Sequence, residues 1–220
     1  MKNIKEKYKL LNQFSIKAKK SNSWYALTGK TLLTALRTKD IVDLDGPVEV
    51  MMTIESYNNF KSKNSHFLSD RTLNNNHLEI RPHYFLNTEH HGEYIRINIV
   101  VPTLINKLKK FNGWKSRKNY YLFKLFNDDK YEKTFMEKIL YISMFPFKNK
   151  IKYKSHITVY NQLFIKKNEG FFEITKPTNP VNKNWIPQLT FKTLSIEVNY
   201  IPVKIPYEYK TILNIWFNYK

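Results

Sequence analysis

The sequence predicts a mixed α/β fold, with a mixed β-sheet flanked by helices, in a single domain of residues 1–220. Segments with apolar residues three or four positions apart, typical of amphipathic helices, follow segments in which apolar and polar residues alternate, as in strands. No internal repeat or long linker divides the chain. Hydrophobic residues make up 42% of it, which is enough for a packed core and too many for a disordered basic tail.

Helices are expected in the segments where the apolar residues recur every three or four positions: 4–20, 32–36, 54–60, 104–111, 120–143 and 206–219. Strands are expected in segments that alternate or form short apolar runs: 24–27, 48–52, 77–81 and 94–101. Polar residues, glycine and proline indicate turns or loops: 28–31, 46–47, 61–76, 90–92 and 148–154. Further ordered segments are expected at 157–165, 171–174 and 191–200.

Composition excludes several classes of protein. Because the chain has no cysteine, disulfides, iron–sulfur clusters and Cys-ligated zinc are excluded. Its five glycines do not cluster as they do in P-loops and dinucleotide-binding loops. The 37 Lys and Arg residues outnumber the 18 Asp and Glu residues, giving a formal net charge of +19. Codon bias toward AT-rich DNA can account for part of this charge.

No targeting or membrane-spanning segment is visible in the sequence. The basic N-terminus is followed by further lysines instead of an apolar signal core (Lys17, Lys19 and Lys20). The apolar stretch 95–104 contains Arg96 and Asn98 and is far shorter than a bilayer span. We therefore expect a cytoplasmic protein, which its charge could draw to the inner face of the membrane as a peripheral protein.

Residues 29–52 read GKTLLTALRTKDIVDLDGPVEVMM and resemble the signature of the LicD family of phosphotransferases. That signature runs G-G-T-L-L-G-A-x-R and then, after a short spacer, I-P-W-D-D-D-I-D-I-x-M, and the two align without a gap. The matching or nearly matching positions are Gly29, Thr31, Leu32, Leu33, Ala35, Arg37, Asp45, Val48, Val50 and Met52. Residues 95–102 and 201–219 are similar to a later family strand and to the family C-terminus, so the resemblance covers nearly the whole chain.

The resemblance implies a nucleotidyltransferase-like fold, with the core signature in 24–102 and a C-terminal part in 103–220. It also implies transfer of a phosphoalcohol such as phosphocholine from a CDP-activated donor to a glycan or glycolipid, as in modification of lipopolysaccharide or another cell-surface glycan. Carboxylate-bound Mg²⁺ would neutralise the donor pyrophosphate. By this resemblance, Asp45 and Glu49 are the candidate catalytic and metal-binding residues. The candidates for binding the donor phosphate are Gly29, Lys30, Thr31 and Arg37.

The chain departs from the family pattern at the positions that carry this chemistry. Pro47 and Asn98 stand where two of the three metal carboxylates are expected, and Glu49 is the carboxylate that remains. Lys30 replaces the second glycine of the turn, and Asn218 replaces the last family glycine. These replacements point to a catalytically impaired enzyme or to a pseudoenzyme.

Other acidic residues offer alternatives for the missing carboxylates. Asp45 and Glu49 are four residues apart, which is too far on an extended strand for both to bind one ion. Asp43 and Asp45 are two residues apart, and a rearranged site could use acidic residues from loops, such as Asp70, Glu79 or Glu89. His90 and His91 are expected to be exposed turn residues, since adjacent residues on a strand point to opposite faces and suit one ion poorly.

Three functions stay open: a LicD-like transferase, a non-catalytic relative that binds a nucleotide, glycolipid or protein partner, and a basic nucleic-acid binder. Lysines and aromatic residues gather in 107–121 and 148–154, a mixture that suits an anionic membrane surface or a nucleic acid. No specific DNA- or RNA-binding motif is present. Because the resemblance implies acceptors that are often lipid-linked glycans, we favour the membrane surface and do not expect a nucleic-acid partner.

Overall fold

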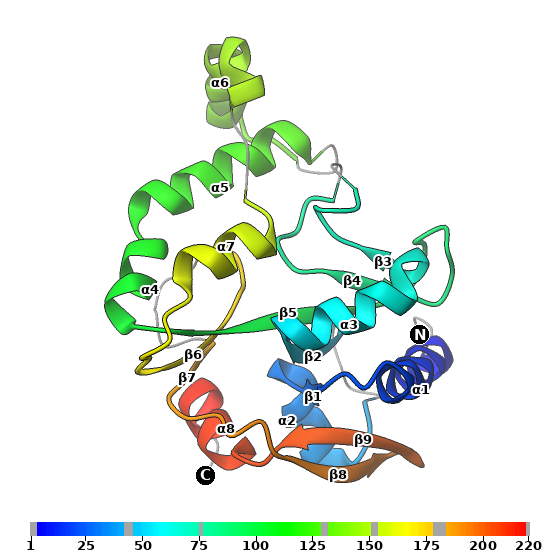
Figure 1. The fold of residues 1–220 in the computed structure, drawn as a ribbon. Helices are drawn as coiled ribbons and strands as arrows, with labels where there is room; N and C mark the ends of the chain where they lie inside the picture. The colour runs from blue at the N-terminus through cyan, green and yellow to red at the C-terminus, as the bar shows by residue number, and fades with distance from the viewer. Residues whose placement is uncertain are drawn as a thin grey trace.

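The computed structural model (Figure 1) describes residues 4–41, 46–74, 77–128, 132–150, 154–177 and 184–218. Its α-helices are α1 (Ile4–Lys20), α2 (Gly29–Thr38), α3 (Ile54–Asn64), α4 (Ile105–Phe111), α5 (Trp114–Asn127), α6 (Phe135–Met144), α7 (His156–Leu163) and α8 (Tyr209–Phe217). Its strands are β1 (Ala26–Leu27), β2 (Val48–Thr53), β3 (Leu68–Ser69), β4 (His83–Phe85), β5 (Tyr94–Thr103), β6 (Gly170–Glu173), β7 (Trp185–Ile186), β8 (Thr193–Val198) and β9 (Ile201–Pro206). Two short 3₁₀ helices are η1 (Ser65–Phe67) and η2 (Phe145–Lys150). The mixed α/β class is confirmed.

β5 is the central strand of the larger sheet, whose order is β1-β2-β5-β4-β3. It pairs in parallel with β2, from Val48 opposite Ile95 to Thr53 opposite Val100. On its other edge it pairs antiparallel first with β4 and then with β6, which also pairs with β7. The β8–β9 hairpin is a separate sheet that contacts β1 and α1. Figure 1 shows β5 crossing the middle of the molecule, with α5 and α6 on one side and α2, α8 and the hairpin on the other.

The two faces of β5 differ in chemistry because successive side chains of a strand point to opposite faces. Ile95, Ile97 and Ile99 are fully buried on one face and belong to a continuous hydrophobic cluster with members from α1 to α8. Arg96 and Asn98 alternate with them and place polar groups on the opposite face. The central strand therefore supports the core and carries a polar site.

Helix α1 attaches to the sheet through Phe14, which is fully buried. Its ring centroid lies 5.2 Å from that of Tyr25, 5.0 Å from that of Phe60 and 5.5 Å from that of Tyr84. Tyr25 precedes β1, Phe60 lies on α3 and Tyr84 on β4, so one side chain joins four parts of the fold. The helix predicted over 4–20 is confirmed with these bounds.

The single helix predicted over 120–143 is wrong, because two helices occupy this region. α5 begins earlier, at Trp114, and ends at Asn127, while α6 begins at Phe135. Thr134 and Glu137 form a capping box, in which each side chain accepts a hydrogen bond from the other residue's backbone N–H. The sequence T-F-M-E at 134–137 is the signal that could have located this helix start.

Two other expectations are corrected between β2 and β5. Residues 61–76 are not simply a loop, since α3 continues to Asn64 and is followed by η1 and β3. The strand predicted at 77–81 is absent, and the strand of this region is β4, after Pro82. Glu79 and Arg81 pair with each other in this segment, and Glu79 also pairs with Arg96 of β5.

β5 extends beyond the predicted 94–101, because it continues through Pro102 to Thr103. The pairing of β2 with β5 ends where Thr53 lies opposite Val100. No β2 residue therefore lies opposite Pro102, which has no N–H to donate. On the other edge Pro102 faces Phe171 of β6.

None of the helices in the described part of the chain has the length and apolar composition that crossing a bilayer requires.

Phe14→Ala should lower the free energy of unfolding by about 3–5 kcal/mol, because it removes a fully buried ring and leaves a cavity. Ile16→Ala on the same helix is the matched control, since Ile16 is 47% exposed and its loss should change stability by less than about 0.5 kcal/mol. Urea unfolding followed by circular dichroism measures both. Equal losses for the two variants would show that Phe14 does not anchor α1.

Candidate functional site

Four charged side chains form a closed ring of ion pairs where β2, β5 and the segment before β4 meet. Arg96 Nη1 lies 3.0 Å from Glu49 Oε1, and Arg96 Nη2 lies 3.0 Å from Glu79 Oε1. Arg81 closes the ring, with Nη1 3.5 Å from Glu49 Oε1 and Nη2 3.2 Å from Glu79 Oε2. The four side chains are between 16% and 31% exposed, so the ring is shielded from bulk water while still reachable.

The register of the sheet brings this ring together. Glu49 of β2 lies directly opposite Arg96 of β5, and His83 of β4 lies opposite Arg96 on the other side. The His83 ring stacks on Tyr94 at 4.1 Å between centroids, and its Nε2 lies 3.4 Å from Glu79 Oε2. Burial lowers the pKa of His83 to about 4, so the imidazole is neutral at pH 7.

The charges of the ring depend on one another. Burial alone would raise the pKa of Glu79, but the neighbouring His83, Arg81 and Arg96 hold that pKa well below its usual range. Burial and the charge of Arg96 both lower the pKa of Arg81, since two guanidiniums lie side by side. The carboxylates of Glu49 and Glu79 are therefore what keeps the two arginines together.

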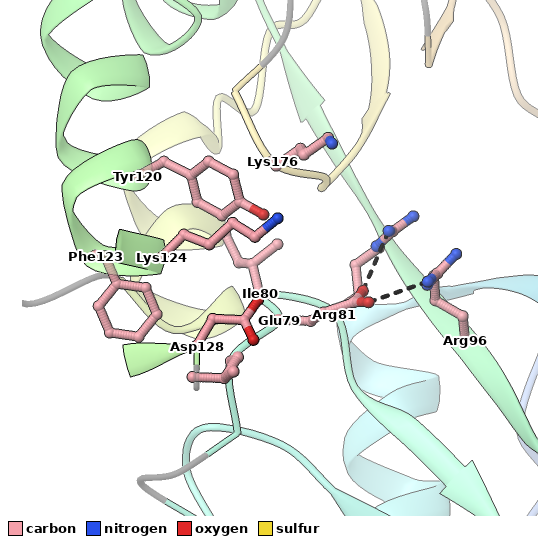
Figure 2. Close-up of a pocket in the computed structure, with 10 residues that line it drawn as sticks. Glu79, Ile80, Arg81, Arg96, Tyr120, Phe123, Lys124, Asp128 and Lys176 are labelled. Atoms are coloured by element: carbon pink, nitrogen blue, oxygen red, sulfur yellow. Dashed lines mark hydrogen bonds and ion pairs between the residues drawn. The ribbon is translucent and has the colours of Figure 1, made fainter. Parts of the chain in front are cut away.

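A cavity of about 420 Å³ opens beside the ring. It is lined by Leu78, Glu79, Ile80, Arg81, Arg96, Tyr120, Phe123, Lys124, Asp128 and Lys176. Figure 2 shows Tyr120 and Lys124 reaching from α5 toward Glu79 and Arg81, and Lys176 arriving from the segment after β6. The lining has four cationic side chains and two carboxylates, so the cavity is positively charged overall.

The structure brings three of the predicted site residues, Gly29, Thr31 and Glu49, together. The backbone N–H of Glu49 donates to Thr31 Oγ1 at 2.8 Å, and the N–H of Thr28 donates to the Glu49 carbonyl at 3.2 Å. Gly29 has a φ of 57°, and a Cβ there would overlap Glu49 Oε2. The start of α2 thus contacts β2 at the carboxylate; the positive φ favours glycine at this position, and a Cβ there would also displace the Glu49 carboxylate from its place in the ring.

The other predicted site residues lie apart from this contact or outside the described residues. Lys30 is exposed. Arg37 is exposed in the last turn of α2, about 12 Å along the helix axis from Gly29, so the two do not meet at one phosphate. Asp45 and Asp43 lie outside the described residues.

Among the alternative acidic residues that the structure describes, Glu79 lines the cavity and Asp70 and Glu89 do not. Asp70 is fully buried elsewhere, where it accepts hydrogen bonds from Tyr57, from Lys61 at 3.0 Å and from the backbone N–H of Leu73 at 3.0 Å. Glu89 is exposed in the turn before β5, and His91 is exposed there as expected, whereas His90 is only partly exposed because its ring lies beside Phe85, with 5.3 Å between the ring centroids.

A second polar cluster, formed by Thr28, Asn98 and Glu173, lies buried close to Glu49. Asn98 Nδ2 donates to Glu173 Oε2 at 3.0 Å, and the Thr28 hydroxyl donates to Glu173 Oε1. Burial raises the pKa of Glu173 to about 8, and the nearby charge of Glu49 adds to this effect, so Glu173 is protonated at pH 7. Asn98 Oδ1 is buried without a hydrogen-bond partner.

As placed, these residues do not fit a Mg²⁺ ion. Mg²⁺ requires oxygen ligands, yet Glu49 is already paired with two guanidiniums and Glu173 is protonated at neutral pH. Within the described ranges, no group of three or more His, Cys, Asp or Glu side chains could hold a metal ion. The expected Mg²⁺ site stays a prediction that depends on Asp45, which is not among the described residues.

Comparisons with protein-family models, with curated proteins and with solved structures return no match. The LicD resemblance and the nucleotidyltransferase-like fold therefore stay predictions. Asn218, which follows α8, has a φ of 52°, the left-handed conformation in which many helices end.

Sequence reasoning missed the residues that form most of this site. Arg96 stands between the isoleucines of β5, and Glu173 stands between Phe172 and Ile174 at the end of β6; a charged residue between apolar neighbours is the signal that could have identified them. Tyr120, Lys124 and Lys176 carry no comparable signal, since they reach the cavity from α5 and from a segment more than 50 residues later in the chain.

Glu173→Gln should remove a pH dependence of stability. The folded-state pKa of Glu173, about 8, exceeds the ordinary value of 4.5, so the native protein loses stability as the pH rises from about 4.5 to 8. The variant should match the native protein near pH 5 and exceed it by a few kcal/mol near pH 9, because one pKa unit corresponds to about 1.4 kcal/mol. Urea unfolding at both pH values measures this, with the exposed Glu197→Gln as control. Parallel pH profiles for native protein and Glu173→Gln would contradict the assignment.

Gly29→Ala should destabilise the protein by about 1–3 kcal/mol more than Gly46→Ala. Both glycines have positive φ, but a Cβ at Gly46 meets no atom within 4 Å, whereas at Gly29 it meets the Glu49 carboxylate. Chemical denaturation compares the two variants, and the excess cost of Gly29→Ala should shrink in a Glu49→Ala background. An equal cost in both backgrounds would mean that Glu49 does not occupy this space.

Proposed function

We propose that the chain binds a phosphorylated ligand of the nucleoside diphosphate type in the cavity beside the ion-pair ring. The observation that supports this most is the convergence of Arg81, Arg96, Lys124 and Lys176 on one cavity. Guanidinium groups present several N–H donors in a plane, which match the oxygens of a phosphate group. The ring holds both guanidiniums in place before a ligand arrives, so less conformational freedom is lost on binding.

Size and lining also favour a nucleotide over a lone phosphate. A cavity of about 420 Å³ falls within the usual range for small-molecule sites, about 300–1,000 Å³. Tyr120 offers a ring near the cationic groups, and a base or an alcohol moiety could pack against it while the phosphates meet the cations. Two carboxylates, Glu79 and Asp128, provide acceptors for sugar or base donors.

The sequence leaves open a LicD-like transferase, a non-catalytic relative that binds a ligand, and a nucleic-acid binder. Of these three, the proposed binding function corresponds to the non-catalytic relative. Glu49 is neutralised by Arg81 and Arg96, so positive charge that a metal ion would supply is already provided by side chains. A cation placed at the same carboxylate would meet both guanidiniums at close range. Binding of the ligand therefore requires no ion in this arrangement.

A LicD-like transfer of a phosphoalcohol, such as phosphocholine from CDP-choline to a glycan or glycolipid, is the second candidate. The contact between Gly29 and Glu49 favours it, because the start of α2 lies beside a strand carboxylate as the resemblance implies. In that reaction the N–H groups at the start of α2 and the cationic cavity would hold the donor phosphates.

Calorimetric titration of CDP and CDP-choline, with and without Mg²⁺, tests the two functions. We expect binding whose affinity Mg²⁺ does not raise. The double variant Lys124→Glu/Lys176→Glu should weaken binding about tenfold or more, because it reverses two charges in the cavity while leaving the ion-pair ring intact.

The matched control is Lys167→Glu/Lys192→Glu, which changes the net charge equally at exposed positions outside the cavity. It should change the affinity less than twofold, by about a few tenths of a kcal/mol. Equal weakening in both double variants would mean that binding follows overall charge and not this cavity. Binding that requires Mg²⁺, with transfer to a glycolipid abolished by Glu49→Gln, would replace the binding function by the transferase.

A further inference from the structure

We propose that α6 and η2 dock the protein on an anionic lipid bilayer by inserting an apolar surface into the interface. This insertion surface consists of Phe135, Met136, Ile139, Ile142, Phe145 and Phe147, which are between 45% and 76% exposed. No residue of α6 is buried. Figure 1 shows α6 standing out at the end of the molecule beyond α5, with no other described element covering it.

The exposed apolar residues of α6 lie on one face of the helix. Phe135, Ile139 and Ile142 are spaced four and three residues apart, which places them on one stripe of an α-helix. Residues of the opposite stripe, Leu140 and Met144, are only partly exposed. A helix that exposes its large apolar side chains outward, away from the chain that supports it, has the geometry of an interfacial helix.

Polar and aromatic contacts fix α6 on α5, so the surface is already formed without a partner. The Tyr121 hydroxyl donates to Glu137 Oε1 at 2.6 Å, and Phe126 stacks on Tyr141 at 4.7 Å between ring centroids. The capping box of Thr134 and Glu137 begins the helix. Docking would therefore bury an existing surface instead of ordering a free segment.

Charge selects an anionic bilayer as the occupant. Residues 130–154 contain seven lysines and two glutamates. Lys138 is exposed on α6, and Lys148 lies with its Nζ 4.6 Å from the centroid of the Phe145 ring, so cationic groups border the insertion surface. Anionic lipid headgroups match this border, whereas a second copy of a chain with a net charge of +19 would bring like charges together.

Docking through α6 would also hold the cavity near the lipid surface. Helix α5 carries α6 near its C-terminal end and lines the cavity with Tyr120, Phe123 and Lys124. The two roles rest on different residues, so the docking proposal does not depend on the identity of the cavity's ligand.

Co-sedimentation with vesicles tests the proposal directly. The native chain should bind vesicles of phosphatidylcholine with phosphatidylserine and bind phosphatidylcholine vesicles weakly. Phe135→Gln/Ile142→Gln should lower the partition coefficient about tenfold or more, because two large side chains no longer enter the interface. The control Ile16→Gln/Leu194→Gln removes two side chains that are 47% and 39% exposed on α1 and β8, and it should bind as the native chain does.

Insertion itself can be observed because the chain has no cysteine. Ile142→Cys labelled with an environment-sensitive fluorophore should show blue-shifted emission with anionic vesicles, while labelled Leu194→Cys should not. Absence of vesicle binding, or equal loss in both double variants, would overturn the proposal. A dimer in sedimentation that dissociates in Phe135→Gln/Ile142→Gln, without vesicle binding, would assign the surface to a second copy and overturn it as well.

Discussion

The parallel pairing of β2 with β5 is the interaction on which the rest of the structure depends. Its register sets Glu49 opposite Arg96, and the same register buries Val48, Val50, Ile95 and Ile97 in the core. Because the side-chain period of a strand is two, a slip by one residue would expose the isoleucines and bury the charges. The hydrophobic core and the ion-pair ring are therefore specified by one pairing.

The ring of Glu49, Arg96, Glu79 and Arg81 is weak evidence for stability, since the cost of removing charges from water offsets much of their attraction. Its value lies in the arrangement that it imposes. Two guanidiniums are held side by side at the wall of a cavity, where a phosphorylated ligand would meet them. The carboxylates of Glu49 and Glu79 pair with these arginines. The buried carboxyl of Glu173 lies nearby without a cationic partner, and it stays protonated at neutral pH.

Helix α5 links the features that we propose to be functional. On this helix, Tyr120, Phe123 and Lys124 line the cavity, while Tyr121 and Phe126 contact α6, whose apolar face is exposed. The short break between the two helices, closed by the capping box at Thr134, makes this arrangement available. An uninterrupted helix over 120–143 would have turned the same apolar residues in other directions.

The sequence by itself determined the mixed α/β class, the helix at 4–20 and the strand around 94–101, because these follow from local periodicity. Tertiary structure alone decided the site. Arg81, Lys124 and Lys176 lie far apart in the chain, and no local pattern relates them. The pKa values of Glu173 and His83 also depend on burial, which is a property of the packed fold and not of the neighbouring residues in sequence.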